Sequence, residues 1–285
     1  MATAVSPPQT SEDGVSGKSV TKDIMAFFSN PKSTAGRDEA FVRRLMDDEH
    51  RKHIDGMHVI TVLFQAARAD RKARDFLPAE FILGKLRSWD REWTERDIST
   101  FVYGIRSLEC LDAKDAELLQ LAALKIKSSQ AALSSRAIGN ALYGLQSITS
   151  DTQGVPAICE ALTDKIALFE VDLSGQDIGI GLYGLQGMTA DLPQVRGLIA
   201  VLARKIAGSE AELDAQALSN ALYGLQSMSS DSPEVLALVA ALATKVAESQ
   251  AELGAQSLGS ALYGLQVIYI IYITSNARIW SIFSF

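Results

Sequence analysis

Cysteine and histidine are scarce in this chain of 285 residues. The two cysteines, Cys110 and Cys159, are too few for a disulfide framework or a four-cysteine zinc site. Cys159 shares its place in a repeat with leucine, isoleucine and valine, so we interpret it as a small buried apolar residue. The three histidines, His50, His53 and His58, lie in one short charged stretch, and we expect solvated surface residues there and no metal site.

A secretory signal is also lacking, because no basic segment followed by an apolar stretch opens the chain. Residues 1–20 mix Pro, Ser and Gly, and we expect a disordered leader over 1–36. This opening stretch has Ser and Thr but no Arg, and it contains Glu12 and Asp13, so it does not by itself indicate organelle targeting. We therefore expect an intracellular protein in a reducing compartment.

No residue pattern typical of an enzyme active site is present, whether a Ser, His and Asp arrangement, a nucleophile elbow or a phosphate loop. A literal GxGxxG occurs at Gly179, Gly181 and Gly184, but no strand pattern precedes it and its equivalents in other repeats continue a helix. We interpret these glycines as helix interior. We therefore predict a protein without catalytic activity, nucleotide or other cofactor.

Positive charge is in deficit. Basic residues number 27 against 34 acidic ones, so the formal net charge is −7. Residues 1–133 hold 20 of each sign, whereas residues 134–266 hold six basic and 14 acidic residues, a net charge of −8. This acidic balance argues against phosphate contacts as the main source of affinity in the second segment.

The most informative feature present is a repeat. The hexapeptide ALYGLQ occurs at 141–146, 221–226 and 261–266, with GLYGLQ at 181–186 and a degraded FVYGIR at 101–106. Its tyrosines are each 40 residues apart, namely Tyr103, Tyr143, Tyr183, Tyr223 and Tyr263. A fixed period of this size is typical of stacked supersecondary units, each too small to bury its apolar face alone.

Each unit contains two helical patterns. Residues of accepted N-cap types share one column, namely Thr94, Ser134, Ser174, Asp214 and Gly254. We expect a first helix to run from this column to about one residue past the Gln of the hexapeptide. A loop such as 229–233 then ends in a proline that suits the first turn of a second helix. The sequence therefore predicts an all-α fold, an α-solenoid of about five antiparallel helical hairpins of 40 residues each.

The repeat weakens toward both ends of the chain. Residues 53–88 look like a divergent first unit in which Leu63 takes the tyrosine position, and the charged residues before them suit an end cap. We therefore predict a cap with a divergent first repeat over 37–90 and regular repeats over 91–266. Residues 267–285 have neither loop chemistry nor the second-helix pattern, and we interpret them as an aberrant tail from intron read-through or truncation. Asn276 and Arg278 interrupt its apolar run, so we expect no membrane anchor.

A glycine follows every tyrosine of the repeat, at Gly104, Gly144, Gly184, Gly224 and Gly264. Within a helix each glycine costs about 1 kcal/mol relative to alanine. A cost that recurs in every unit predicts close approach by the backbone of a neighbouring helix.

The tyrosine column lies on the polar arc of the first helix and has two interpretations. In one, the rings pack between successive hairpins. In the other, they form a row of stacking platforms flanked by groups able to hydrogen-bond base edges or a peptide backbone. These flanking residues are Arg136, Asn140, Gln176, Gln216, Asn220 and Gln256.

A lysine column near the end of the second helix comprises Lys125, Lys165, Lys205 and Lys245. These cations could offset the helix dipole while their stems cover apolar neighbours. Alternatively, the ammonium groups could form a ladder for a polyanion, because successive helices pack roughly 8–10 Å apart.

The segment SNALYGLQSM at 219–228, with its cap, loop and second helix, resembles the organellar helical-repeat proteins of the octotricopeptide and FAST-kinase-like class that often carry a RAP domain. It is similar to the repeat domain of kinetoplastid RNA-editing substrate-binding proteins. The resemblance covers about 91–266. It implies single-stranded RNA binding in mitochondria or plastids, with roles in transcript processing, stability or editing.

Two functional classes therefore remain, and a third is less favoured. RNA binding is favoured by the resemblance and by the aromatic and amide arc, and it would place the protein in mitochondria or plastids. A protein-interaction scaffold similar to TPR or HEAT arrays is favoured by the acidic balance, and it would suit a cytoplasmic location. The third is an enzyme that has lost its catalytic domain at the truncated end.

Overall fold

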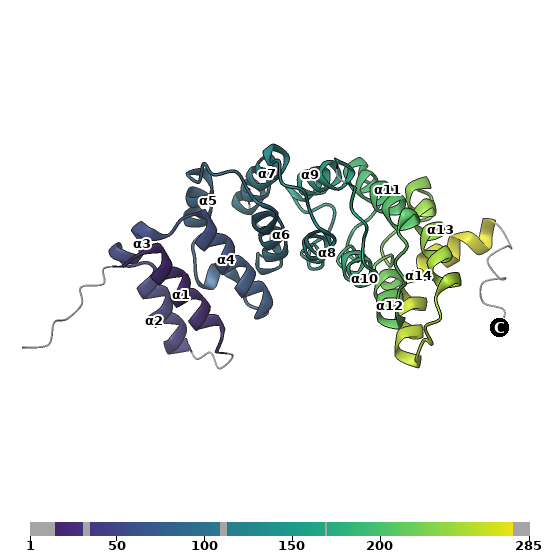
Figure 1. The fold of residues 1–285 in the computed structure, drawn as a ribbon, viewed down its shortest axis with the longest axis horizontal. Coiled ribbons are helices and arrows are strands. Elements are labelled where there is room, and N and C mark those ends of the chain that lie inside the picture. The colour runs from purple at the N-terminus through teal and green to yellow at the C-terminus, as the bar shows by residue number, and fades with distance from the viewer. Residues whose placement is uncertain (1–14, 31–34, 109–112, 169, 276–285) are drawn as a thin grey trace, which may run out of the picture.

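The computed structural model describes residues 15–30, 35–108, 113–168 and 170–275, and these residues contain helices and no strand. Its helices form an arc of two rows, consistent with an α-solenoid (Figure 1). The inner row comprises α4 (Gly56–Arg68), α6 (Glu95–Gly104), α8 (Ser135–Tyr143), α10 (Gly175–Tyr183), α12 (Ala215–Tyr223) and α14 (Ala255–Ser275). The outer row comprises α5 (Ala79–Arg87), α7 (Ala113–Ser128), α9 (Val155–Leu168), α11 (Pro193–Gly208) and α13 (Pro233–Glu248).

Helices α1 (Gly17–Phe28), α2 (Ala35–Leu45) and α3 (Asp48–His53) precede the rows, and the short 3-10 helices η1 (Ala73–Asp75) and η2 (Ile105–Ser107) lie within them. The expectation of a disordered leader over 1–36 is therefore wrong for α1. Val20, Ile24 and Phe27 recur at helical spacing and are buried, and α1 packs on α4. Residues 1–14 lie outside the described part of the chain.

The predicted starts of the inner helices are confirmed at four positions. The side chains of Thr94, Ser134, Ser174 and Asp214 each accept a hydrogen bond from a backbone N–H in the first turn of the helix that follows. Such a bond satisfies a donor that has no partner within the helix. The local sequence thus fixes where each of these helices begins.

The predicted ends of the inner helices are wrong by about four residues. α8, α10 and α12 end at the tyrosine, and the chain then tightens, as where Leu145 N–H donates to Leu142 C=O at 3.0 Å. The glycine is therefore the residue after the helix and not its interior. α14 instead continues to Ser275, because the residues after Gln266 have no loop chemistry; the rest of the predicted tail, 276–285, lies outside the described residues.

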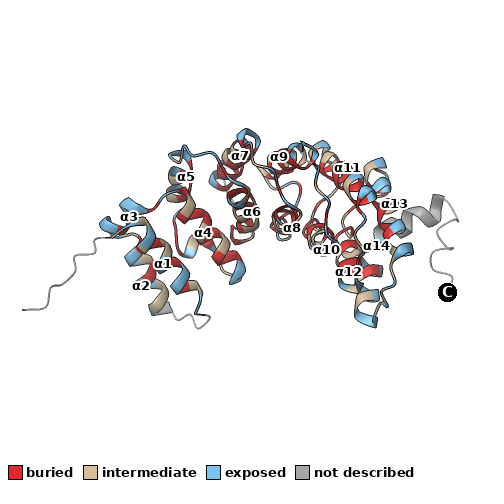
Figure 2. Ribbon diagram, viewed as in Figure 1, coloured by how far each residue is buried: buried red, intermediate tan, exposed pale blue. Residues whose placement is uncertain are grey.

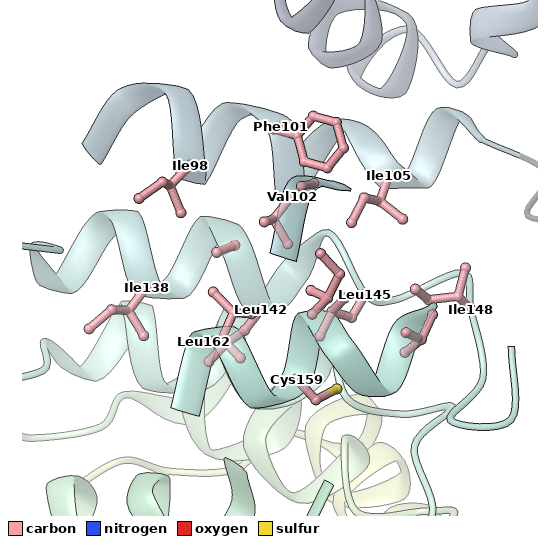
Figure 3. Packing of buried hydrophobic residues seen from close by; sticks show 14 of the residues in the cluster. Ile98, Phe101, Val102, Ile105, Ile138, Leu142, Leu145, Ile148, Cys159 and Leu162 are labelled. Carbon is pink, nitrogen blue, oxygen red and sulfur yellow. The ribbon is translucent and has the colours of Figure 1, made fainter. Parts of the chain in front are cut away.

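Buried residues fill the space between the two rows (Figure 2). Ile138, Leu142 and Leu145 of the inner side lie near Cys159 and Leu162 of α9 (Figure 3). Cys159 is fully buried, as the apolar character of its repeat column predicts. Among the described helices, none has the length and hydropathy needed to cross a membrane.

The glycine after each tyrosine lies against the preceding inner helix, as predicted. A Cβ added at Gly144, Gly184, Gly224 or Gly264 would stand 2.0–2.1 Å from a carbonyl oxygen of that helix. These oxygens belong to the residue just before the preceding tyrosine, so the same contact recurs at four successive steps of the array. Only a residue without a side chain permits this approach.

We predict that Gly224→Ala destabilises the protein by at least about 2 kcal/mol, because the new methyl group would overlap the backbone of α10. Gly84→Ala in α5 is the matched control, since a Cβ there meets no atom within 4 Å and alanine is the better helix former. Urea unfolding followed by far-UV circular dichroism measures both. Equal effects of the two substitutions would contradict the close-approach explanation.

Burial raises the pKa of the Cys159 thiol from 9.0 to about 12. The unfolded thiol ionises first, so this contribution to stability is present below pH 9 and is lost as the pH rises toward 12. We predict that Cys159→Val, which introduces the residue found at Val239, flattens the fall in unfolding free energy between pH 9 and pH 11. Urea titrations at several pH values measure it, and parallel curves for the two proteins would contradict the assignment.

Candidate functional site

The inner row carries a continuous column of aromatic rings. Successive centroids lie 5.6, 6.2, 5.4 and 5.6 Å apart from Tyr103 to Tyr263, and the last three pairs are stacked within 25° of parallel. The glycine contacts explain this spacing, because they bring neighbouring inner helices together at the residue beside each ring. We call the column, including Phe64 described next, the ring ladder.

Phe64, and not Leu63, extends the ladder at its N-terminal end. Its ring centroid lies 5.0 Å from that of Tyr103, whereas Leu63 is fully buried. The 40-residue register places Leu63 opposite Tyr103, but the step is 39 residues here. A Cβ added at Gly104 would lie 2.8 Å from the Leu63 Cβ and not against a carbonyl oxygen, so α4 and α6 meet one residue out of the 40-residue register.

The faces of the tyrosine rings are occupied by stacking on neighbouring rings. Tyr103, Tyr143, Tyr183 and Tyr223 are half-buried, and burial raises the pKa of the Tyr183 hydroxyl. Each ring of the ladder is called a rung. A base placed between two rungs would have to push the stacked rings apart. These contacts support the packing interpretation, and they leave ring edges and hydroxyls as the groups open to a ligand. Tyr263, at the last rung, is 50% exposed.

Glutamines form a second line beside the rings, three residues after each tyrosine. Gln186 Nε2 donates to the Gln146 backbone carbonyl at 3.4 Å, and Gln226 Nε2 donates to Gln186 Oε1 at 3.1 Å. We did not single out these glutamines from the sequence, although the final letter of the hexapeptide carries the signal. A ring and an amide thus recur together at the end of each of these inner helices.

The predicted polar neighbours also lie on the inner row. Gln176, Gln216 and Gln256 are exposed at the second position of α10, α12 and α14, and Arg136 is exposed at the same position of α8. Asn140 and Asn220 are half-buried one turn later. In α12 the exposed arc is opposite the buried Leu218 and Ala221, so it turns away from the outer row.

The lysine column lies on the outer row, apart from the ring ladder, and its ammonium groups have protein partners. Lys125 Nζ donates to Trp89 C=O at 2.7 Å, and Lys245 Nζ donates to Ser209 C=O at 2.5 Å. Lys165 bonds the carbonyl of Ser129 in the same way, and Lys205 lies 3.3 Å from a Glu170 carboxylate oxygen. Lys165 and Lys245 are buried, so these contacts support the packing interpretation over an open cationic ladder.

Charge is unevenly distributed around the array. Most acidic residues of 134–266 lie on outer helices, in turns and in the loops that enter inner helices; the exceptions on the inner row are the cap Asp214 and Asp177, which accepts from two serine hydroxyls. Arginines gather at the N-terminal end of the inner row, namely Arg68, Arg96, Arg106 and Arg136. Over 134–266 the surface opposite the outer row is therefore polar and nearly free of negative charge, whereas α6 carries Glu95 and Asp97 in its first turn.

The histidines do not behave as predicted. His50 and His58 are buried, and only His53 is exposed. His58 contacts Asp55 at 2.6 Å through Nδ1 and the Gly17 carbonyl at 2.9 Å through Nε2, which joins α4 to α1. α1 was not expected from the sequence, and its cover explains the burial. Within the described residues, no group of three His, Cys, Asp or Glu side chains could hold a metal ion.

Comparison with known proteins gives no assignment: no protein-family model, curated protein or solved structure matches this chain. The fold defines a class only, an all-α stack of helices in two rows. The site is defined by its own geometry, with ring edges and amides along the inner row.

We predict that the pair Tyr183→Ala and Tyr223→Ala destabilises the array by about 3 kcal/mol or more, because each ring is packed between two others. The pair Tyr183→Phe and Tyr223→Phe keeps the ring contacts and removes only hydroxyls, so we expect a change below about 1 kcal/mol. Thermal unfolding measures both. A stable alanine pair would show that the ladder is not structural.

Proposed function

We propose that this protein is a non-catalytic α-solenoid of about five helical hairpins that binds single-stranded RNA along its inner row. The observation that carries the proposal is the recurrence of one exposed guanidinium or amide side chain at the second position of successive inner helices, at Arg96, Arg136, Gln176, Gln216 and Gln256. From α8 to α14 this surface is polar and almost without acidic residues, although the array as a whole is acidic.

Amide and guanidinium groups suit RNA because they pair with the hydrogen-bonding edges of bases. Unstacked bases of a single strand present those edges, whereas a duplex conceals them. The glycine contacts fix the distance between neighbouring inner helices, and they thereby constrain the spacing of these groups as well as that of the rings. The tyrosine hydroxyls and the glutamines of the hexapeptide add further polar contacts, and base stacking between rungs has no part in this binding mode.

The resemblance of the repeat to organellar helical-repeat proteins supports the same proposal. It implies a role in RNA processing, stability or editing in a mitochondrion or plastid. The aromatic before Gly144, Gly184, Gly224 and Gly264 carries this resemblance.

A protein-interaction scaffold is the second candidate, favoured by the outer row. Two equivalent hollows of about 360 and 500 Å³ lie one repeat apart, between the ends of successive outer helices. Glu210 and Glu248 line one beside Lys245, and Glu170 and Asp172 line the other beside Arg204 and Lys205. Hollows lined by both signs of charge suit a polypeptide that carries both acidic and basic side chains.

The test is the binding of a labelled single-stranded RNA at low salt to the full chain and to the double variant Gln176→Ala and Gln216→Ala. Both glutamines are exposed, so we expect the fold to be retained and the RNA affinity to fall about tenfold or more, as one lost bidentate pair costs about 1–3 kcal/mol. Fluorescence anisotropy measures the affinity.

The matched control is Gln120→Ala with Gln153→Ala, which removes two exposed glutamines from α7 and from the turn before α9. We expect this control to bind RNA as the unsubstituted protein does. Equal losses in the two double variants would exclude the inner row as the site. Undetectable RNA binding by the unsubstituted protein at low salt would favour the scaffold instead.

A further inference from the structure

The ring ladder differs between its two ends. Three residues after the tyrosine, Gln146, Gln186, Gln226 and Gln266 follow four of the rungs, but Arg106 follows Tyr103. The neighbouring rung also has an arginine, because Arg68 lies four residues after Phe64. Two successive rungs at the N-terminal end therefore carry a cation where the C-terminal rungs carry an amide.

Arg106 is held by the rings. Its guanidinium carbon lies 4.7 Å from the Tyr143 centroid and 5.5 Å from that of Tyr103, and Nη1 donates to the Tyr103 hydroxyl at 3.2 Å. Contacts with two rings and a hydroxyl restrict the plane of the guanidinium before any ligand arrives. A guanidinium has five N–H donors, so most remain for a ligand.

Arg68 lies on the adjacent rung. Its guanidinium carbon lies 5.8 Å from the Phe64 centroid, and Phe64 lies 5.0 Å from Tyr103. Arg68 is exposed and Arg106 half-buried. Within the described residues, neither guanidinium has a carboxylate at ion-pair distance, whereas Arg71, Arg74, Arg87 and Arg91 each have one.

We propose that Arg106 and Arg68 form the phosphate-binding end of the RNA site. A planar guanidinium matches the oxygens of a phosphodiester in a bidentate manner, and a cation already oriented by aromatic rings loses less freedom on binding. The amide rungs beyond Tyr143 carry no cation, so base edges are contacted there and phosphate is held at the N-terminal end. This assignment rests on the proposed RNA-binding function. It distinguishes the N-terminal end of the site, which holds phosphate, from the remaining rungs, which contact bases.

The decisive variant is Arg106→Gln, because glutamine occupies the same position at four other rungs and is compatible with the ladder. The salt dependence of binding to a single-stranded RNA is measured in the full chain. Each lost phosphate contact reduces the slope of log Kobs against log salt by about 0.7. We expect that reduction for Arg106→Gln, about twice it for Arg106→Gln with Arg68→Gln, and a weaker affinity in both.

Arg204→Gln is the matched control, since it removes the same charge from an exposed position of the outer helix α11. We expect it to leave the slope unchanged. Equal slopes for Arg106→Gln and the unsubstituted protein, or equal reductions in Arg106→Gln and Arg204→Gln, would overturn the assignment.

A second probe separates this inference from the proposed function. Inorganic polyphosphate has phosphate groups and no bases, so it tests the anion site without contacts to base edges. Polyphosphate binding that is weakened by Arg106→Gln, in a protein that does not bind RNA, would support the anion site and refute the RNA function. RNA binding with an unchanged slope in Arg106→Gln would support the RNA function and refute the anion site. If the protein binds neither RNA nor polyphosphate, both proposals are overturned.

Discussion

The contact between four repeat glycines, Gly144, Gly184, Gly224 and Gly264, and a carbonyl of the preceding inner helix is the constraint on which the rest of the array depends. It brings the inner helices together at their ends, and rings 40 residues apart then stack at 5.4–6.2 Å. The outer helices α7, α9, α11 and α13 are longer, at 14–16 residues, and pack through Leu, Ile and Val side chains. Close spacing on one side and bulkier packing on the other is the physical reason for the arc.

The same arrangement divides the polar chemistry of the molecule. On the outer row, Lys125, Lys165 and Lys245 donate to backbone carbonyls of the preceding repeat, and Lys205 pairs with the Glu170 carboxylate. These contacts hold units together and keep buried polar groups satisfied. Polar groups of the inner row, such as Gln176 and Gln216, are exposed and do not have this task. Recognition of a ligand can therefore vary from unit to unit on the inner row without weakening the stack.

Much of the fold could be predicted because it depends on local chemistry. N-caps at Ser134 and Ser174 and the glycine approach follow from residue type and spacing, which act within one or two units. Prediction failed where a distant segment intervenes. α1 covers His58, and α4 meets α6 one residue out of the 40-residue register, so that Phe64 and not Leu63 reaches Tyr103. The candidate site was found in part: the tyrosine column was evident, but Arg106 and the glutamine line were not recognised.

The sequence by itself determined the repeat, its helical hairpins and the side chains that recur at each step, because a 3.6-residue period and cap residues are properties of the chain. Only the tertiary structure decided what those side chains do. Tyr183 stacks on its neighbours because the glycine contact sets the distance between helices, and Lys165 is buried because the preceding repeat offers it a carbonyl. Spacing along a chain specifies which groups meet, whereas the separation of packed backbones decides whether a ligand can fit between them.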